Sequence, residues 1–259
     1  SWWPFDETNQ SLGIAEDIIN SYNGTYVSNT QIVEGYNGNA LLFDGYDDLV
    51  DVGNRAEFSR GMDYRFPLTI EFWYNQTAAT GNALHFMGKR APCSTMNYQA
   101  GIEYQVANSG LFFGGNNGGA STNIRPPIQT WHHYAATFDG TSVKLYLNGQ
   151  LVRQSPATSV GPLVGSPLTL GGIGGAFGPF CGGMLGVMDE VTFYGRALSD
   201  TEIQAIYNAG SAGKCKTVSI TTVSPLLAQA HAFFSEQLRA QLGVPPYTWS
   251  VVGGSLPLG

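Results

Sequence analysis

Residues 186–194, with the sequence GVMDEVTFY, alternate in the manner of a β-strand and contain two adjacent carboxylates. In this alternation Asp189 shares a face with three apolar residues, whereas Glu190 faces the other way. The three apolar residues are Val187, Val191 and Phe193. A carboxylate on an apolar face is costly unless a partner compensates it. Four partners are open for Asp189: the guanidinium of Arg196, a backbone amide, a water molecule or a hard cation.

Calcium is the hard cation that suits this position, because it takes six to eight oxygen ligands from carboxylates and carbonyls. Two further acids lie in segments rich in turn residues, Asp17 before IINSYNG and Asp44 in FDGYDD. The sequence therefore predicts a structural calcium site with Asp17, Asp44 and Asp189 as ligands. The alternatives are that Asp189 pairs only with Arg196 or the backbone, and that Asp44 caps its own turn.

The ionisable residues do not form a pattern that predicts catalysis. Retaining glycosidases need two carboxylates about 5 Å apart, but the alternation places Asp189 and Glu190 on opposite faces. Glu71 is a single acid, which we expect to be exposed or satisfied in the core. His132 and His133 are neighbours in a strand and face opposite sides, so they cannot bind one metal ion together. We therefore expect no catalytic residues.

The elements that must position these residues are predicted to be β-strands. Only 12% of the residues are charged and 34 are glycine, a composition typical of a β-sandwich with many turns. Residues 130–154 contain the turns Asp139-Gly140 and Asn148-Gly149, which predict a three-stranded meander. A strand is also predicted over 66–76, and two more flank the turn Asp44-Gly45.

One short helix is predicted over 199–209. Ser199 and Glu202 have the spacing of a capping box, and Gly210 fits the end of the helix. A domain boundary is predicted near residues 210–215, which gives a domain at 1–213 and a β segment at 214–259.

A different segment, residues 85–125, combines the residue types that bind carbohydrates. Such sites use aromatic platforms surrounded by amide and guanidinium groups on a shallow surface. The segment is predicted to contain strands at 98–106 and 110–115 and to be rich in loops. It offers these candidates for ligand binding: Arg90, Asn97, Tyr98, Tyr104, Phe113, Asn116, Asn117 and Arg125. The alternative is that Tyr104 and Phe113 belong to the sheet core and that the asparagines only form turns.

Charge and cysteine content restrict the class of protein further. The net charge is −7 and no cluster of Lys or Arg could neutralise phosphates, so nucleic acid is not an expected partner. No apolar run is long enough to insert into a membrane. Sparse lysine and many Asn, Gly and Thr indicate a secreted or cell-surface protein. Cys93 and Cys181 lie in loops bounded by Gly or Pro and are predicted to form a disulfide, leaving Cys215 free or paired outside this sequence.

Five stretches in chain order resemble the bacterial laminin G-like, or concanavalin A-like, jelly-roll domain over about residues 1–213. They are WWPFDET, GNALLFDGYDDLVDVG, LTIEFWYN, WHHYAATFDGTSVKLYLNGQLV and GGMLGVMDEVTFYGRALSDTEIQAIYNAG. The resemblance implies an all-β, two-sheet antiparallel jelly-roll sandwich, exported to the cell surface or beyond. It commonly carries one calcium ion, at the positions given above, and serves in carbohydrate binding, adhesion or as an accessory module of larger enzymes.

The tail resembles the start of a bacterial immunoglobulin-like repeat, through the stretch GVPPYTWSVVGGSLPLG. The repeat is incomplete, and unpaired strand edges can be completed by another chain. The main expectation is a non-catalytic extracellular carbohydrate-binding module, stabilised by calcium, within a larger protein. The alternatives are a structural or adhesive domain that contacts other protein chains through its tail and, less favoured, a polysaccharide-degrading enzyme.

Overall fold

The computed structural model describes residues 1–55, 58, 67–80, 84–90, 98–105, 110–115, 118–157, 166–172, 183–212, 214, 219–220 and 240–241. The chain divides into two compact units, Ser1–Ser211 and Ala212–Gly259. In the second unit the described residues include a two-stranded pair of β17 (Ser219–Ile220) and β18 (Ala240–Gln241). Among the described helices, none has the length and apolar character needed to cross a membrane.

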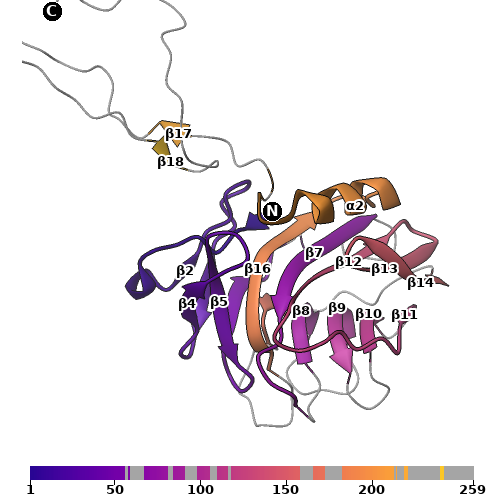
Figure 1. The fold of residues 1–259 in the computed structure, drawn as a ribbon, viewed down its shortest axis with the longest axis horizontal. Coiled ribbons are helices and arrows are strands. Elements are labelled where there is room, and N and C mark those ends of the chain that lie inside the picture. The colour runs from indigo at the N-terminus through magenta and orange to yellow at the C-terminus, as the bar shows by residue number, and fades with distance from the viewer. Residues whose placement is uncertain are drawn as a thin grey trace, which may run out of the picture. The chain divides into compact units, whose positions relative to one another are not determined.

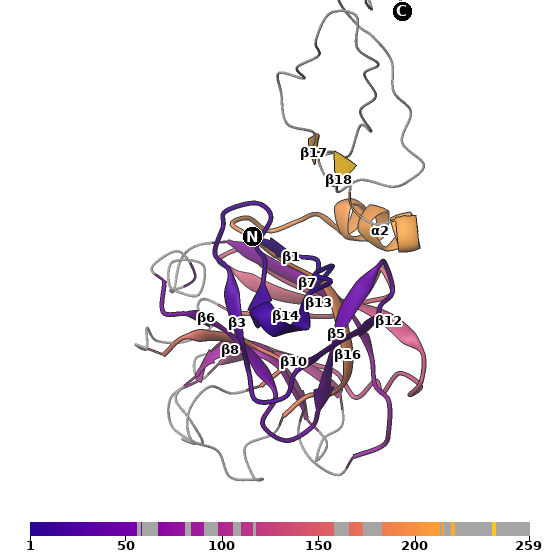
Figure 2. The same cartoon turned by 90° about the vertical axis from the view of Figure 1, so that its left-hand side faces the viewer.

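The first unit consists of two eight-stranded antiparallel sheets (Figure 1, Figure 2). Across sheet A the order is β14 (Gln150–Pro156), β13 (Ser142–Leu147), β12 (Trp131–Phe138), β7 (Leu68–Asn75), β16 (Leu185–Tyr194), β5 (Asn39–Asp44) and β4 (Gln31–Glu34), with β1 (Trp2–Trp3) also paired to β16. Across sheet B the order is β11 (Gly118–Ser121), β10 (Gly110–Gly115), β9 (Tyr98–Gln105), β8 (Leu84–Arg90), β15 (Leu168–Leu170), β6 (Leu49–Gly53), β3 (Gly24–Val27) and β2 (Ile14–Ala15). The other elements are η1 (Gln10–Leu12), α2 (Asp200–Ala209) and η2 (Gly210–Ala212). The predicted all-β sandwich with one short helix is confirmed.

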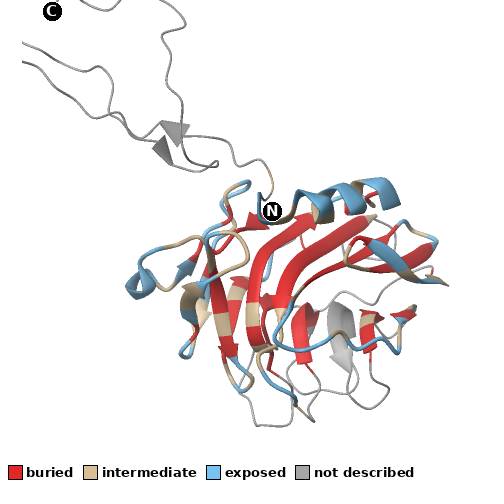
Figure 3. Cartoon of the chain, viewed as in Figure 1, coloured by how far each residue is buried: buried red, intermediate tan, exposed pale blue. Residues whose placement is uncertain are grey.

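The main core lies between the two sheets, and β7 shows how the sequence builds it (Figure 3). Leu68, Ile70, Phe72 and Tyr74 alternate along this strand and are at most 1% exposed. The rings of Phe72 and Tyr74 pack on Phe86 of β8, with centroids 5.1 and 4.7 Å away. Burial of each such side chain contributes about 2 kcal/mol, so the predicted strand is held mainly by its inner face.

Helix α2 covers the opposite face of sheet A (Figure 1). Its capping box forms as predicted: the Ser199 hydroxyl accepts from the Glu202 N–H, and the Glu202 carboxylate accepts from the Ser199 N–H. Ile203 is fully buried, and the ring of Tyr207 stacks 5.7 Å from that of Trp73 in β7. The central strand β7 is therefore buried on both faces.

The meander is confirmed, but the strands around Asp44 are arranged differently from a hairpin. Asn148 and Gly149 have φ of 49° and 75°, as the tight turn between β13 and β14 requires. In contrast, β5 pairs with β16 in sheet A, whereas β6 pairs with β15 and β3 in sheet B. The Asp44-Gly45 turn therefore carries the chain from one sheet to the other.

Within residues 85–125, most of the part that the structure describes lies in β8, β9, β10 and β11, four neighbouring strands of sheet B. The strands predicted at 98–106 and 110–115 are confirmed as β9 and β10, whereas β8 and β11 were not predicted. Strand β8 was missed for a physical reason: its pairing with β9 shifts register twice, between His85 and Met87 and between Gly88 and Arg90. These irregularities remove the strict alternation by which a strand is recognised in a sequence.

Candidate functional site

The two adjacent acids of β16 lie at a β-bulge, which changes the faces predicted for them. Glu190 has φ of 57°, and the register with β7 shifts between Asp189 and Thr192. Asp189 lies opposite Trp73, on the face of sheet A away from the main core, whereas Val191 lies in that core. The prediction that Asp189 shares a face with Val191 and Phe193 is therefore wrong, because the bulge inverts the alternation partway along the strand.

Both carboxylates bind the turn formed by residues 35–38. One oxygen of Asp189, Oδ2, accepts from the backbone N–H groups of Tyr36 and Asn37, at 2.8 and 2.9 Å. Glu190 accepts from Asn37 Nδ2 at 2.9 Å through Oε1 and from Trp2 Nε1 at 2.8 Å through Oε2. Both acids thus bind the same residue, Asn37. The sequence had predicted that they point to opposite sides of the sheet.

Asp189 is fully buried, and its second oxygen, Oδ1, has no hydrogen-bond partner among the described residues. Burial raises the pKa of the Asp189 carboxyl well above its usual range, and the charges of Glu190 and Asp6 raise it further, against the lowering effect of the Asn37 N–H. Arg196 is not its partner, because the two terminal guanidinium nitrogens, Nη1 and Nη2, bind Glu202 instead, at 3.0 and 2.7 Å. Of the four partners considered, the structure shows the backbone amides, and Oδ1 remains available to a cation or a water molecule.

The structure places the other two predicted calcium ligands in separate surroundings. Asp17 accepts from the backbone N–H groups of Trp2, Ile19 and Tyr22. Burial raises the pKa of this carboxyl, but the hydrogen bonds, chiefly from Trp2 and Ile19, outweigh burial and lower it overall. Asp44 accepts from the N–H of Tyr46 at 2.8 Å, which is the turn cap that the sequence offered as an alternative.

Asp44 also belongs to the one group of three potential metal ligands found among the described residues. It lies with Asp47 and Asp48, and their oxygens are within 4.8 Å of one another. Neither Asp17 nor Asp189 belongs to this group, so the three predicted ligands do not gather at one point.

The 35–38 turn depends on Gly38, which has φ of +83°. A Cβ on Gly38 would lie 2.1 Å from Asp6 Oδ1, which accepts from the N–H of Asn39. We expect Gly38→Ala to lower the free energy of unfolding by about 2 kcal/mol, from the unfavourable φ and the displaced carboxylate. Gly13→Ala is the matched control, because Gly13 has φ of +61° but an added Cβ would meet no atom within 4 Å. Urea denaturation would measure both, and equal losses would show that the contact with Asp6 contributes nothing.

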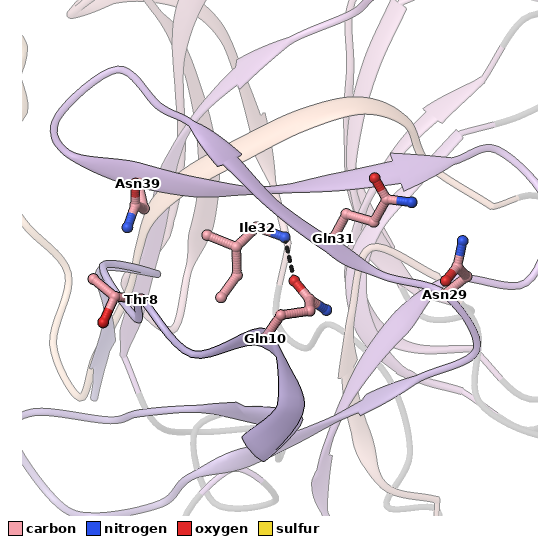
Figure 4. Close-up of a pocket in the computed structure, with 6 residues that line it drawn as sticks. All are labelled: Thr8, Gln10, Asn29, Gln31, Ile32 and Asn39. Carbon is pink, nitrogen blue, oxygen red and sulfur yellow. Dashed lines mark hydrogen bonds between the residues drawn. The ribbon is translucent and has the colours of Figure 1, made fainter.

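A second feature is a hollow of about 550 Å³ at the edge of sheet A, shown in Figure 4. We call it the amide hollow, because four of its lining residues are amides; the full lining is Thr8, Gln10, Asn29, Gln31, Ile32 and Asn39. Small-molecule sites occupy about 300–1,000 Å³, so its size suits a ligand. The lining comes from three segments: η1 and the residues before it, the first half of β4 with Asn29 before it, and the start of β5.

Two of the amides are fixed by the fold. Gln10 binds the free edge of β4 as a neighbouring strand would: its Nε2 donates to the Thr30 carbonyl at 2.5 Å and its Oε1 accepts from the Ile32 N–H at 2.6 Å (Figure 4). Asn39 Nδ2 donates to the carbonyl of Glu7 at 3.0 Å. Within the described part of the chain, the side chains of Thr8, Asn29 and Gln31 make no hydrogen bond. This hollow was not predicted from the sequence. The local signal for the hollow is the density of amides in TNQ and NTQI.

For most of the residues predicted to bind carbohydrate, the structure does not describe the side chain. Asn97, Asn116 and Asn117 lie entirely outside the described residues, as do Cys93 and Cys181 of the predicted disulfide and the third cysteine, Cys215. The backbones of Arg90 and Tyr98 are cross-strand partners in β8 and β9, and Tyr104 lies opposite Leu111, but their side chains are outside the description. Arg125 is exposed. Phe113 is fully buried in the core, as the alternative interpretation held, so it is not a binding platform.

The remaining pair of ionisable residues lies on the face of sheet A that α2 covers. His133 Nε2 is 3.1 Å from Glu71 Oε2, and both side chains are fully buried. Tyr194 donates to the other oxygen, Glu71 Oε1, at 3.4 Å, and burial followed by the charge of Glu71 raises the pKa of Tyr194. Glu71 is thus a satisfied buried acid, one of the two outcomes predicted, and it is closed off from solvent.

Comparison with known proteins gives one family and a set of similar folds. The profile of the concanavalin A-like lectin/glucanases superfamily matches residues 44–204, more than half of the chain. No curated protein sequence matches. Domain 4 of AbnA, a GH43 extracellular arabinanase from Geobacillus stearothermophilus solved in complex with arabinotriose, is 18% identical, with a TM-score of 0.57 over 79% of this chain and 96% of that one.

Two other solved structures share the fold over part of their length. Trypanosoma rangeli sialidase in complex with sialic acid is 14% identical, with a TM-score of 0.61 over 80% of this chain and 32% of that one. The binding domain of Paraclostridial Mosquitocidal Protein 1 is 17% identical, with a TM-score of 0.58 over 75% and 49%. At these identities the similarity establishes the fold.

Proposed function

The chain belongs to the concanavalin A-like lectin/glucanases superfamily, and from this we propose that it is a non-catalytic carbohydrate-binding module of a larger secreted or cell-surface protein, stabilised by calcium. The observation that carries the proposal is the amide hollow, an uncharged, hydrogen-bonding surface of suitable size on a lectin-like sandwich. The arabinanase domain solved with arabinotriose supports it, because that domain has this fold along nearly its whole length.

A structural calcium ion would suit Asp189. The unpartnered Oδ1 of a fully buried carboxylate is the kind of oxygen that calcium takes as a ligand, and Asp6 and Glu190 add negative charge around it. When bound, the ion would supply the positive charge that no described basic side chain provides there. Asp189 and Glu190 would then hold both the ion and the 35–38 turn, which joins β4 to β5 beside the amide hollow.

The arrangement of the acids supports a binding role over a catalytic one. Glycoside hydrolysis needs two carboxylates free to face a sugar from either side. Asp189 and Glu190 are both hydrogen-bonded to the 35–38 turn, and Glu71 lies beneath α2. Asp44, Asp47 and Asp48 cluster at the turn between β5 and β6, where Asp44 and Asp48 accept hydrogen bonds from backbone N–H groups.

The function is tested by affinity electrophoresis of the whole chain in gels that contain a single soluble polysaccharide, with calcium in the buffer. We expect retardation by at least one polysaccharide, with no release of reducing sugar during incubation. Release of reducing sugar would overturn the non-catalytic assignment. Retardation by none of a broad panel would overturn carbohydrate binding and leave the alternative of protein contacts through the C-terminal segment.

A further inference from the structure

We propose that the amide hollow is the glycan-binding site and that its ligand is a neutral glycan, one without carboxylate or sulfate groups. The inference rests on the proposed carbohydrate-binding function and deepens it. It assigns the site to a surface other than the 85–125 segment that the sequence suggested, and it excludes acidic sugars.

The chemistry of the lining matches sugar hydroxyls. Each hydroxyl both donates and accepts hydrogen bonds, and so does a side-chain amide, with one acceptor oxygen and two N–H donors. Asn29, Gln31 and Thr8 have no hydrogen-bond partner among the described residues and present amide or hydroxyl groups to this space. Ile32 adds an apolar side chain to the described lining, and this side chain can contact the C–H face of a sugar ring (Figure 4).

The floor of the hollow is ordered before any ligand arrives. Gln10 is held to β4 by two short hydrogen bonds, and Asn39 is held to the backbone of Glu7. A site whose groups are already fixed loses less conformational entropy when it binds. The same contacts of Gln10 occupy the edge of β4, so this edge is less open to pairing with a strand from another chain.

The charge around the hollow favours a neutral ligand. Among the described residues that line it there is no lysine, arginine or histidine, whereas two carboxylates bind the backbone of lining residues. Asp6 Oδ1 accepts from the N–H of Asn39, and Asp48 Oδ1 accepts from the N–H of Asn29, at 3.1 and 2.9 Å. A uronate or sulfate in the hollow would therefore meet negative charge with no cation to offset it.

The test uses the whole chain, in calcium, with neutral polysaccharides such as arabinan, xylan and β-glucan and with acidic ones such as polygalacturonate and a sulfated galactan. The double variant Asn29→Ala/Gln31→Ala removes both unpartnered amides. Gln150→Ala/Gln154→Ala is the matched control, because these exposed glutamines lie on β14 at the opposite edge of the same sheet. Dissociation constants would come from affinity electrophoresis, and melting temperatures would confirm that all proteins are folded.

We expect the wild type to bind a neutral polysaccharide, the hollow variant to bind it about tenfold more weakly or worse, and the control to match the wild type. Neutral binding that the hollow variant retains would overturn the site while leaving the proposed function intact. A preference for the acidic polysaccharides, lost at high salt, would overturn the ligand class. Binding of no polysaccharide would remove the proposed function itself, and this inference with it.

Discussion

Replacing Asp189 with alanine is expected to lower the free energy of unfolding by about 2–4 kcal/mol in calcium, which corresponds to a fall in melting temperature of roughly 5–15 °C. The reason is that one carboxylate oxygen accepts from the backbone of both Tyr36 and Asn37, and the variant leaves these donors without that partner. The proposed ion would lose a ligand in the same step. Differential scanning calorimetry with calcium and with a chelator measures both effects.

The chelator provides the discriminating comparison. The wild type should melt at a higher temperature in calcium than in chelator, and Asp189→Ala should show no such difference. Asp44→Ala is the control, because Asp44 belongs to the separate acidic group with Asp47 and Asp48. If Asp44→Ala abolished the calcium response and Asp189→Ala preserved it, the ion would belong to that other group.

The pH dependence in chelator follows from the raised pKa of Asp189. For this carboxyl the pKa is higher in the folded protein than in the unfolded protein, where it is near 3.9. Such a group makes its full contribution to stability only below the unfolded pKa. This contribution is lost as the pH rises through the folded pKa. Asp189→Asn cannot ionise, so in chelator the wild type should lose stability relative to this variant as the pH rises above about 4. If the wild type and Asp189→Asn differed by a constant free energy of unfolding as the pH rose, this would contradict a buried, uncompensated charge on Asp189.

Replacing Glu71 with alanine is expected to cost about 3–5 kcal/mol of unfolding free energy. Glu71 and His133 are both fully buried between sheet A and α2, and the variant would leave His133 Nε2 without this partner as well as a cavity. Tyr194 would also lose the acceptor of its hydroxyl. Urea denaturation followed by tryptophan fluorescence suits this site, because Trp73 lies 5.3 Å from the His133 ring.

Two further variants distinguish the loss of the Glu71–His133 pair from the general effect of removing a glutamate. Glu34→Ala removes an exposed glutamate from the edge strand β4 and should change stability by less than about 0.5 kcal/mol. Glu71→Gln keeps an acceptor for Tyr194 and a polar group beside His133, so it should cost less than alanine. Equal costs for Glu71→Gln and Glu71→Ala would show that packing volume, and not hydrogen bonding, makes this residue necessary.

The sequence could predict the features that depend on neighbours along the chain. The meander follows from one Asp-Gly turn and one Asn-Gly turn between alternating strands. The capping box follows from Ser199 and Glu202, which are three residues apart, and the inner face of β7 follows from the alternation of its residues. The family and the sandwich follow in turn, because many such local patterns occur in a fixed order. Calcium binding and the disulfide remain predictions.

The tertiary structure alone decided the features that join distant segments. The bulge at Glu190 shifts the register of β16 against β7, and both carboxylates at this bulge bind the 35–38 turn. Glu71 meets His133 across 62 residues of sequence, and the amide hollow combines three segments that no local pattern connects. A sequence specifies where a side chain lies relative to its own strand, but its partners depend on the pairing and register of strands that are far apart along the chain.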